Sequence, residues 1–208
     1  MYPKRLDPEC CQSLSNIKAF VSSTSGVLNN NQDLIGVSRG WVRLMVDLPL
    51  GGFLRSHYDG QGVSLLRAIG INIAFVHVDI YDEDDPVSKL VTRWNTLPSA
   101  VKPGENGGWP PVKLINGVVG DEQIQPVQEW LEDLGLTFSN CAVMGHDLVQ
   151  IPLLRRASFK VAPAQAEKVV QDMVDWVTPR PGGNGALRDF ANLVLEVRKI
   201  DPTTLPTR

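Results

Sequence analysis

The sequence has few cysteines, no long apolar run and no excess of charge of either sign. Its three cysteines are Cys10, Cys11 and Cys141, and because the first two are adjacent and poorly placed to bridge each other, we expect no disulfide framework. No apolar run approaches the roughly 20 residues of a spanning helix, and the first residues lack the apolar centre of a secretory signal. We therefore expect a cytoplasmic protein in a reducing compartment, with no membrane partner.

The charge balance argues against nucleic acid as a partner. The 208 residues carry 20 Lys and Arg against 23 Asp and Glu, and the adjacent basic pairs are scattered along the chain. Such a chain exerts no long-range attraction on a phosphate backbone. A hydrophobic content of 43% over this length is enough for one domain with a full core.

Apolar runs alternate with segments of helical spacing over most of the chain. The pattern predicts strands at about 17–23, 71–78, 112–115, 141–144, 159–161 and 174–177, and helices at about 62–70, 82–94, 121–134, 148–157, 164–173 and 186–199. This alternation is typical of an α/β domain with a mostly parallel sheet covered on both faces, whose site lies beyond the carboxyl ends of the strands. We expect one such domain at 17–200, between an N-terminal leader at 1–16 without periodicity and a C-terminal tail at 201–208.

Two insertions interrupt the alternation. Short β-rich pieces at 34–37, 41–47 and 53–58, separated by Arg39-Gly40 and Gly51-Gly52, predict a flap of antiparallel hairpins at about 30–58, directly after the first strand. A stretch rich in glycine and proline predicts a loop insertion at about 96–111.

Four segments carry a resemblance to a known family. Ser23-Thr24-Ser25-Gly26 is similar to D-x-D-G, and Asp59-Gly60-Gln61-Gly62 to R-D-G-x-G. Gly145-His146-Asp147 follows a strand as G-D-D does, and Gly182 to Asp189 is similar to G-G-R-G-A-x-R-E. In this order they resemble the haloacid dehalogenase superfamily, in the branch of the 3-deoxy-manno-octulosonate 8-phosphate phosphatases and the C-terminal domain of animal CMP-sialic acid synthetases. The resemblance implies a Rossmannoid three-layer fold with a β-flap.

The catalytic positions implied by this resemblance are degenerate. Ser23 and Ser25 stand where the family has the nucleophilic and the acid-base aspartate, and His77 stands where a Ser or Thr holds the phosphoryl group. The helix start that should carry a lysine has Gln123, and of the metal-binding carboxylates Asp147 remains. A serine without an activating base is a poor nucleophile at neutral pH. We therefore predict a pseudophosphatase that acts as an oligomerisation, structural or regulatory module and needs no cofactor.

Several alternatives remain open. The chain could be a phosphatase for an octulosonic or nonulosonic acid phosphate, in which case Mg²⁺ is expected, or a protein that senses a sugar phosphate without hydrolysing it. It could also be a hydrolase with a rebuilt transition-metal site at His77, His146 and Asp147, because imidazole and carboxylate suit Zn²⁺. Asp47 in Val46-Asp47-Leu48-Pro49 is a rival nucleophile, although Pro49 would then stand at the position of the acid.

The remaining candidate site residues are Asp59 and three glycines near the last helix, and we first expect structural roles for them. We expect Asp59 to cap the helix that begins near Gly62. Gly182, Gly183 and Gly185 indicate a tight turn before the last helix. In the resembled family this turn lies near the substrate, so these four residues are also candidates for substrate binding.

The flap sequence predicts an assembly. Its aliphatic residues alternate with others, so that one face would carry Val42, Leu44, Val46, Leu48 and Leu50. A lone α/β domain would leave this face exposed, and Trp41 is a further candidate for a subunit contact. We expect a homo-oligomer, a tetramer by resemblance, and leave room for another protein partner.

Overall fold

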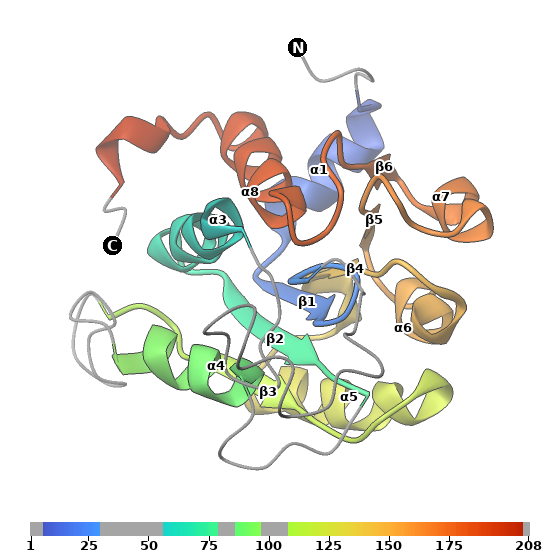
Figure 1. Cartoon of the computed structure of the whole chain (residues 1–208). Coiled ribbons are helices and arrows are strands. Elements are labelled where there is room, and N and C mark those ends of the chain that lie inside the picture. Colours follow the sequence, from blue (N-terminus) through green and yellow to red (C-terminus); the bar gives the residue numbers. More distant parts are fainter. Residues whose placement is uncertain (1–5, 30–55, 79–85, 97–107, 206–208) are drawn as a thin grey trace, which may run out of the picture.

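The chain forms a six-stranded, entirely parallel sheet with helices on both faces (Figure 1). The computed structural model describes residues 6–29, 56–78, 86–96 and 108–205. The strand order is β3-β2-β1-β4-β5-β6, which places the first strand at the centre. The predicted three-layer α/β fold, a parallel sheet between two layers of helices, is confirmed.

The central strands are mostly apolar and buried, apart from the partly exposed Asn72 at the start of β2. β1 (Ala19–Ser23) is buried along its whole length, and β2 (Asn72–Val76) and β4 (Cys141–Met144) pair with it on either side. The outer strands are β3 (Val112–Ile115), β5 (Phe159–Ala162) and the short β6 (Trp176–Val177). Apolar runs of this kind suit strands that are buried on both faces of a parallel sheet.

Each face of the sheet has its own apolar core. Successive residues of a strand, such as Phe20 and Val21, point to opposite faces of the sheet. Phe20 therefore packs in one apolar cluster and Val21 in the other. The first core is closed by α1 (Pro8–Asn16), α3 (His57–Ala68), α4 (Pro86–Thr96) and α8 (Ala186–Val197). The second is closed by α5 (Ile124–Asp133), α6 (Ile151–Leu154) and α7 (Lys168–Met173), as Figure 1 also shows. Among the described residues, no helix is long and apolar enough to cross a membrane.

Helices α3 and α8 lie against each other on the first face (Figure 1). A Cβ atom at Gly62 would lie 2.9 Å from the backbone of Arg188 and Leu187, so a larger residue there would push the helices apart. Phe190 of α8 stacks on Phe20 of β1 at a centroid distance of 4.6 Å. This packing fixes the start of α8 next to the start of α3.

The N-terminal segment differs from its prediction. Part of the expected leader is helix α1, which begins after Asp7, whose carboxylate accepts a hydrogen bond from the Cys10 amide at 2.7 Å. Leu14 of this helix is fully buried, so the segment belongs to the core. Its apolar periodicity is weak because only one short apolar face of α1 touches the domain. In the expected tail, Leu205 packs against the first core after the turn Pro202–Thr204.

The segment around residue 57 also differs. We predicted a β-rich piece at 53–58 and a helix from Gly62, whereas α3 begins at His57 with Ser56 as its N-cap. The Ser56 hydroxyl accepts a hydrogen bond from the Tyr58 amide, and this cap outweighs the β propensity of the aromatic residue. The remainder of the predicted flap, with Trp41, Val42, Leu44, Val46, Asp47, Leu48 and Leu50, lies outside the described residues.

Candidate functional site

The predicted site residues gather at one end of the sheet, where β1, β2 and β4 finish; we call this the carboxyl edge. Ser23 pairs in register with Val76, and Ser22 with Met144. The residues that follow, His77 after β2 and Gly145 after β4, therefore lie beside the end of β1. The sheet brings the first, second and fourth motif positions together, as parallel strand ends are expected to do.

The loop after β1, residues 24–29, is closed by its own hydrogen bonds. The Thr24 carbonyl accepts a hydrogen bond from the Leu28 amide at 2.9 Å, and the Asn29 side chain accepts one from the Gly26 amide at 3.1 Å. The Ser23 hydroxyl donates to the Ser25 carbonyl at 3.1 Å. Ser23 is therefore engaged within its own loop, and no histidine or carboxylate activates it in the described contacts.

His77 is paired with a residue that the sequence analysis did not single out. Its Nδ1 atom and the Thr24 hydroxyl form a hydrogen bond, and both side chains are buried. The His77 amide also donates to the Ile115 carbonyl at 2.8 Å, which ties the end of β2 to β3. The sequence offered a signal for Thr24. It is two residues after Ser22, so the alternation of β1 places it on the same side as Ser22 and opposite to Ser23.

Asp147, the surviving carboxylate of the fourth motif, caps the turn that follows it. Its Oδ1 atom accepts a hydrogen bond from the Leu148 amide at 2.6 Å, at the start of the 3₁₀ turn Leu148–Gln150. The Gln150 side chain reaches back and accepts from the amides of Asp147 at 3.0 Å and His146 at 3.3 Å. Together they form a capping box, in which each side chain satisfies backbone amides of the turn.

His146 is buried against the loop after β1. A Cβ atom at Gly26 would lie 2.3 Å from the Cγ and Cδ2 atoms of the His146 ring, so the ring rests directly on the Gly26 backbone. Both ring nitrogens are buried and have no hydrogen-bond partner among the described residues. Burial lowers the pKa of the His146 imidazole below its usual range, although the Asp147 and Glu167 carboxylates act in the opposite direction. Burial therefore favours the neutral form of the ring.

Gln123 occupies the position where the resembled family has a lysine. It ends the 3₁₀ turn Gly120–Gln123 before α5, and this turn packs against the turn Leu148–Gln150. Its side chain is buried, and its amide nitrogen donates to the Val118 carbonyl at 3.3 Å. The described residues give its Oε1 atom no partner. The position thus offers a neutral amide and no cation.

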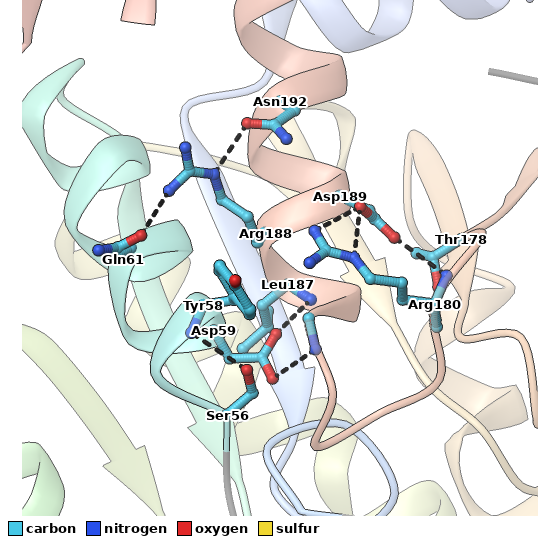
Figure 2. Close-up of polar contacts among 11 residues, drawn as sticks. Ser56, Tyr58, Asp59, Gln61, Thr178, Arg180, Leu187, Arg188, Asp189 and Asn192 are labelled. Atoms are coloured by element: carbon cyan, nitrogen blue, oxygen red, sulfur yellow. Dashed lines mark hydrogen bonds and ion pairs between the residues drawn. The ribbon is translucent and has the colours of Figure 1, made fainter. Parts of the chain in front are cut away.

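Asp59 caps a different helix from the one we predicted (Figure 2). Its two carboxylate oxygens accept hydrogen bonds from the amides of Gly185 at 3.0 Å and Leu187 at 2.9 Å, at the start of α8. Its own helix, α3, already has Ser56 as its cap. Asp59 is 1% exposed, and burial raises its pKa to about 6, against the hydrogen bonds and the charge of Arg180, which lower it. Its described role is structural, and its predicted substrate contact stays a prediction.

The turn before α8 is fastened to the loop after β1. The Gly183 amide donates to the Val27 carbonyl at 2.8 Å, and a Cβ atom at Gly182 would lie 1.9 Å from the Gly26 carbonyl oxygen. Gln165 bridges the two segments, since it accepts from the Gly182 amide at 2.8 Å and donates to the Gly26 carbonyl at 2.7 Å. Sequence analysis gave no signal for Gln165. The close approach explains why glycine is needed at position 182.

Figure 2 shows the ion pair of Arg180 and Asp189 near Asp59. Gly185 makes room for this pair. It has φ +108°, and a Cβ atom there would lie 2.5 Å from the Arg180 guanidinium. Arg180 donates to Asp189 at 2.6 and 2.9 Å and stacks 5.3 Å from the centroid of the Tyr58 ring. The predicted tight turn is thus present, and the start of α8 is held by two buried carboxylates.

The described side chains do not fit the magnesium ion that the resemblance associates with this site. Mg²⁺ takes several oxygen ligands, usually including carboxylates, and one of the two oxygens of Asp147 accepts a hydrogen bond from the Leu148 amide. Among the described residues, no three His, Cys, Asp or Glu side chains form a group that could hold a metal ion. His77, His146 and Asp147 are all described, so the arrangement also lacks the rebuilt transition-metal site that we considered.

The chain resembles known proteins in sequence over a short segment and in fold over most of its length. No family model matches the chain. The 3-deoxy-D-manno-octulosonate 8-phosphate phosphatase of Escherichia coli K12 is 35% identical over 65 residues, which span 31% of this chain and 35% of that protein. The solved phosphatase of the same name from Yersinia pestis superposes with a TM-score of 0.72 at 22% identity, over 97% of this chain and 92% of that one.

The chain has the haloacid dehalogenase fold, because the solved structure of a hydrolase of that superfamily from Legionella pneumophila superposes with a TM-score of 0.70 at 24% identity, over 92% of this chain and 88% of that one. A further solved structure, the 3-deoxy-D-manno-octulosonate 8-phosphate phosphatase of Moraxella catarrhalis, has a TM-score of 0.68 at 22% identity and covers 92% of each chain. The resemblance predicted from the motifs is therefore confirmed in the haloacid dehalogenase fold, with neighbours in the 3-deoxy-manno-octulosonate 8-phosphate phosphatase branch. The chain matches about a third of the length of the curated Escherichia coli relative.

Proposed function

We propose that this chain is a non-catalytic member of the haloacid dehalogenase fold, related to sugar-acid phosphatases and used as an assembly or regulatory module. One observation carries the proposal. The positions that correspond to catalytic carboxylates and lysine hold Ser23, Ser25, His146 and Gln123, and the remaining Asp147 accepts a backbone amide.

The physical reason is the loss of every large contribution to phosphoryl transfer. The serine hydroxyls are not activated by a described base, and a neutral amide at Gln123 cannot neutralise developing negative charge. Among the described residues there is also no group of ligands for a divalent cation that would polarise the phosphoryl group. Each such contribution is worth roughly 2 to 4 kcal/mol of barrier reduction or more, and no other described side chain supplies them.

The second candidate function is a phosphatase acting on an octulosonic or nonulosonic acid phosphate. The comparisons favour this candidate over the first, because the proteins with similar sequence and fold are named as phosphatases or hydrolases. Under this hypothesis Mg²⁺ would be required, and the carboxylates would have to come from outside the described residues, with Asp47 as the candidate from the sequence.

Phosphate release decides between the two functions. The purified chain is incubated with 3-deoxy-manno-octulosonate 8-phosphate and with an aryl phosphate, with Mg²⁺ or with chelator. We expect no release above buffer by the wild type, and little by the double variant Ser23→Asp with Ser25→Asp, because Gln123 and Gln150 remain. Release that requires Mg²⁺ and is lost in Asp47→Asn or Asp147→Asn would establish the phosphatase.

Assembly through the flap is part of the proposal. Val42, Leu44 and Val46 would form the subunit contact of a homo-oligomer, and a tetramer is the state that the resemblance suggests. Burial of aliphatic side chains at roughly 1.5 to 3 kcal/mol each supports such a contact. Light scattering on the wild type and on Leu44→Glu with Val46→Glu tests it. A monomeric wild type, or a variant of unchanged mass, would refute the flap contact.

A further inference from the structure

The contact between His146 and Gly26 joins two loops that both belong to the carboxyl edge. Gly26 lies in the loop after β1, and His146 follows β4. Their van der Waals contact is direct, because a single carbon added at Gly26 would overlap the ring. Gly26 has φ +69°, a conformation that also disfavours any side chain at this position.

The imidazole makes this contact through van der Waals packing, not through hydrogen bonds of its ring nitrogens. It is 8% exposed, and neither ring nitrogen has a hydrogen-bond partner among the described residues. A metal ligand or a general base would direct one nitrogen to an ion, a proton or an acceptor. A ring with both nitrogens covered contributes to the contact through its packing area.

Side chains of neighbouring described residues hydrogen-bond the backbone around this contact. The Gln150 side chain accepts hydrogen bonds from the amides of His146 and Asp147, and the Asp147 side chain accepts one from the Leu148 amide. The backbone amides that follow β4 are therefore paired with side chains of the same turn. The Gly26 carbonyl accepts from Gln165. The acidic groups that act on His146 are Asp147 and Glu167.

We propose that His146 and Gly26 form a metal-free joint that holds the loop after β1 against the end of β4, so that the carboxyl edge is ordered without a divalent cation. Clustered carboxylates at such an edge would repel one another and need a cation between them. Here a buried ring takes the place of one carboxylate. The joint goes beyond the proposed function, because a protein that hydrolyses nothing could still bind a cation at this edge.

Thermal unfolding of the full chain tests the joint. Wild-type protein is measured in chelator, in millimolar Mg²⁺ and in micromolar Zn²⁺. We expect the same melting temperature in all three. A melting temperature that rises by more than about 3 °C with Mg²⁺ or Zn²⁺, a shift that selective binding to the folded state would cause, overturns the proposal.

Two substitutions at His146 separate packing from ligation. His146→Leu keeps an apolar side chain and removes two unpartnered nitrogens, so we expect its melting temperature to equal or exceed that of the wild type. His146→Asp places a second carboxylate beside Asp147, so we expect a lower melting temperature in chelator that Mg²⁺ partly restores. A loss in His146→Leu as large as that in His146→Asp would mean that the nitrogens are needed, and would refute the joint.

A matched control uses an exposed histidine of the same chain. His57, at the start of α3, is exposed, and His57→Asp adds a carboxylate without touching the joint. Its melting temperature should not respond to Mg²⁺. Phosphate release with no cation response would refute the proposed function alone, whereas a cation response of the wild type without phosphate release would refute the joint alone.

Discussion

Asp59 links the first turn of α3 to the start of α8, and its replacement by asparagine should change how stability depends on pH. In the wild type, two buried amides, those of Gly185 and Leu187, donate to one carboxylate. The asparagine side chain would keep one carbonyl oxygen as acceptor and would present an NH₂ group to the other amide. One buried amide would then be unsatisfied, at a cost of about 1–3 kcal/mol.

The magnitude of the pH effect follows from linkage. The pKa of Asp59 is raised from 3.8 to about 6 by burial, so the folded state binds the proton more tightly than the unfolded state. Protonation therefore stabilises the folded protein as the pH falls through 6, and the gain grows until the pH reaches the unfolded value. Between pH 8 and pH 5 this contribution amounts to about 1.4 kcal/mol. Asparagine cannot titrate, so the variant Asp59→Asn lacks this gain.

Urea denaturation at pH 5, 6 and 8 measures the difference. The free energy of unfolding of the wild type minus that of Asp59→Asn should be about 1.4 kcal/mol larger at pH 5 than at pH 8. Asp133→Asn, at an exposed position at the end of α5, is the control for loss of a carboxylate. A wild-type minus Asp59→Asn difference that stays constant across this range would show that Asp59 does not titrate there, and that burial is not its dominant perturbation.

Three further outcomes are expected. Gly62→Ala should lower the free energy of unfolding by about 1–3 kcal/mol, because its Cβ atom would lie 2.9 Å from the backbone of α8; unchanged stability would mean that the two helices can separate freely. Asp189→Asn should cost about 1–3 kcal/mol through loss of the partly buried pair with Arg180, and the loss should persist in high salt if the pair is shielded as the contacts indicate. The lowered pKa of His146 means that, as the pH falls, the unfolded protein binds this proton before the folded protein does, so the free energy of unfolding decreases below pH 6.5. His146→Leu should remove this decrease in the same urea series. A variant with the wild-type pH profile would contradict the assignment.

Local patterns in the sequence were sufficient for the sheet and for the general location of the site. The buried strand at 19–23 begins with an apolar run and ends in two serines, and the glycine-containing segments that follow strands occur in the order of a known fold. Parallel strands place all their carboxyl ends together, so Ser23, His77 and Asp147 can be assigned to one edge from the order of strands and helices alone. Helix α1 could also have been found, because Asp7 followed by Pro8 is a helix-start signal in the sequence.

The partners of the site residues were decided by tertiary structure. Asp59 caps a helix 126 residues further along the chain, the His146 ring rests on Gly26, and Gln165 bridges Gly26 and Gly182. These contacts depend on the approach of α3 to α8 and on the packing of loops from different strands, to a fraction of an ångström. Spacing along the chain determines which residues reach the same edge, because strand direction and period are local properties. It does not determine which neighbour a carboxylate or a ring will meet there, because many different packings of loops and helices satisfy the same local pattern.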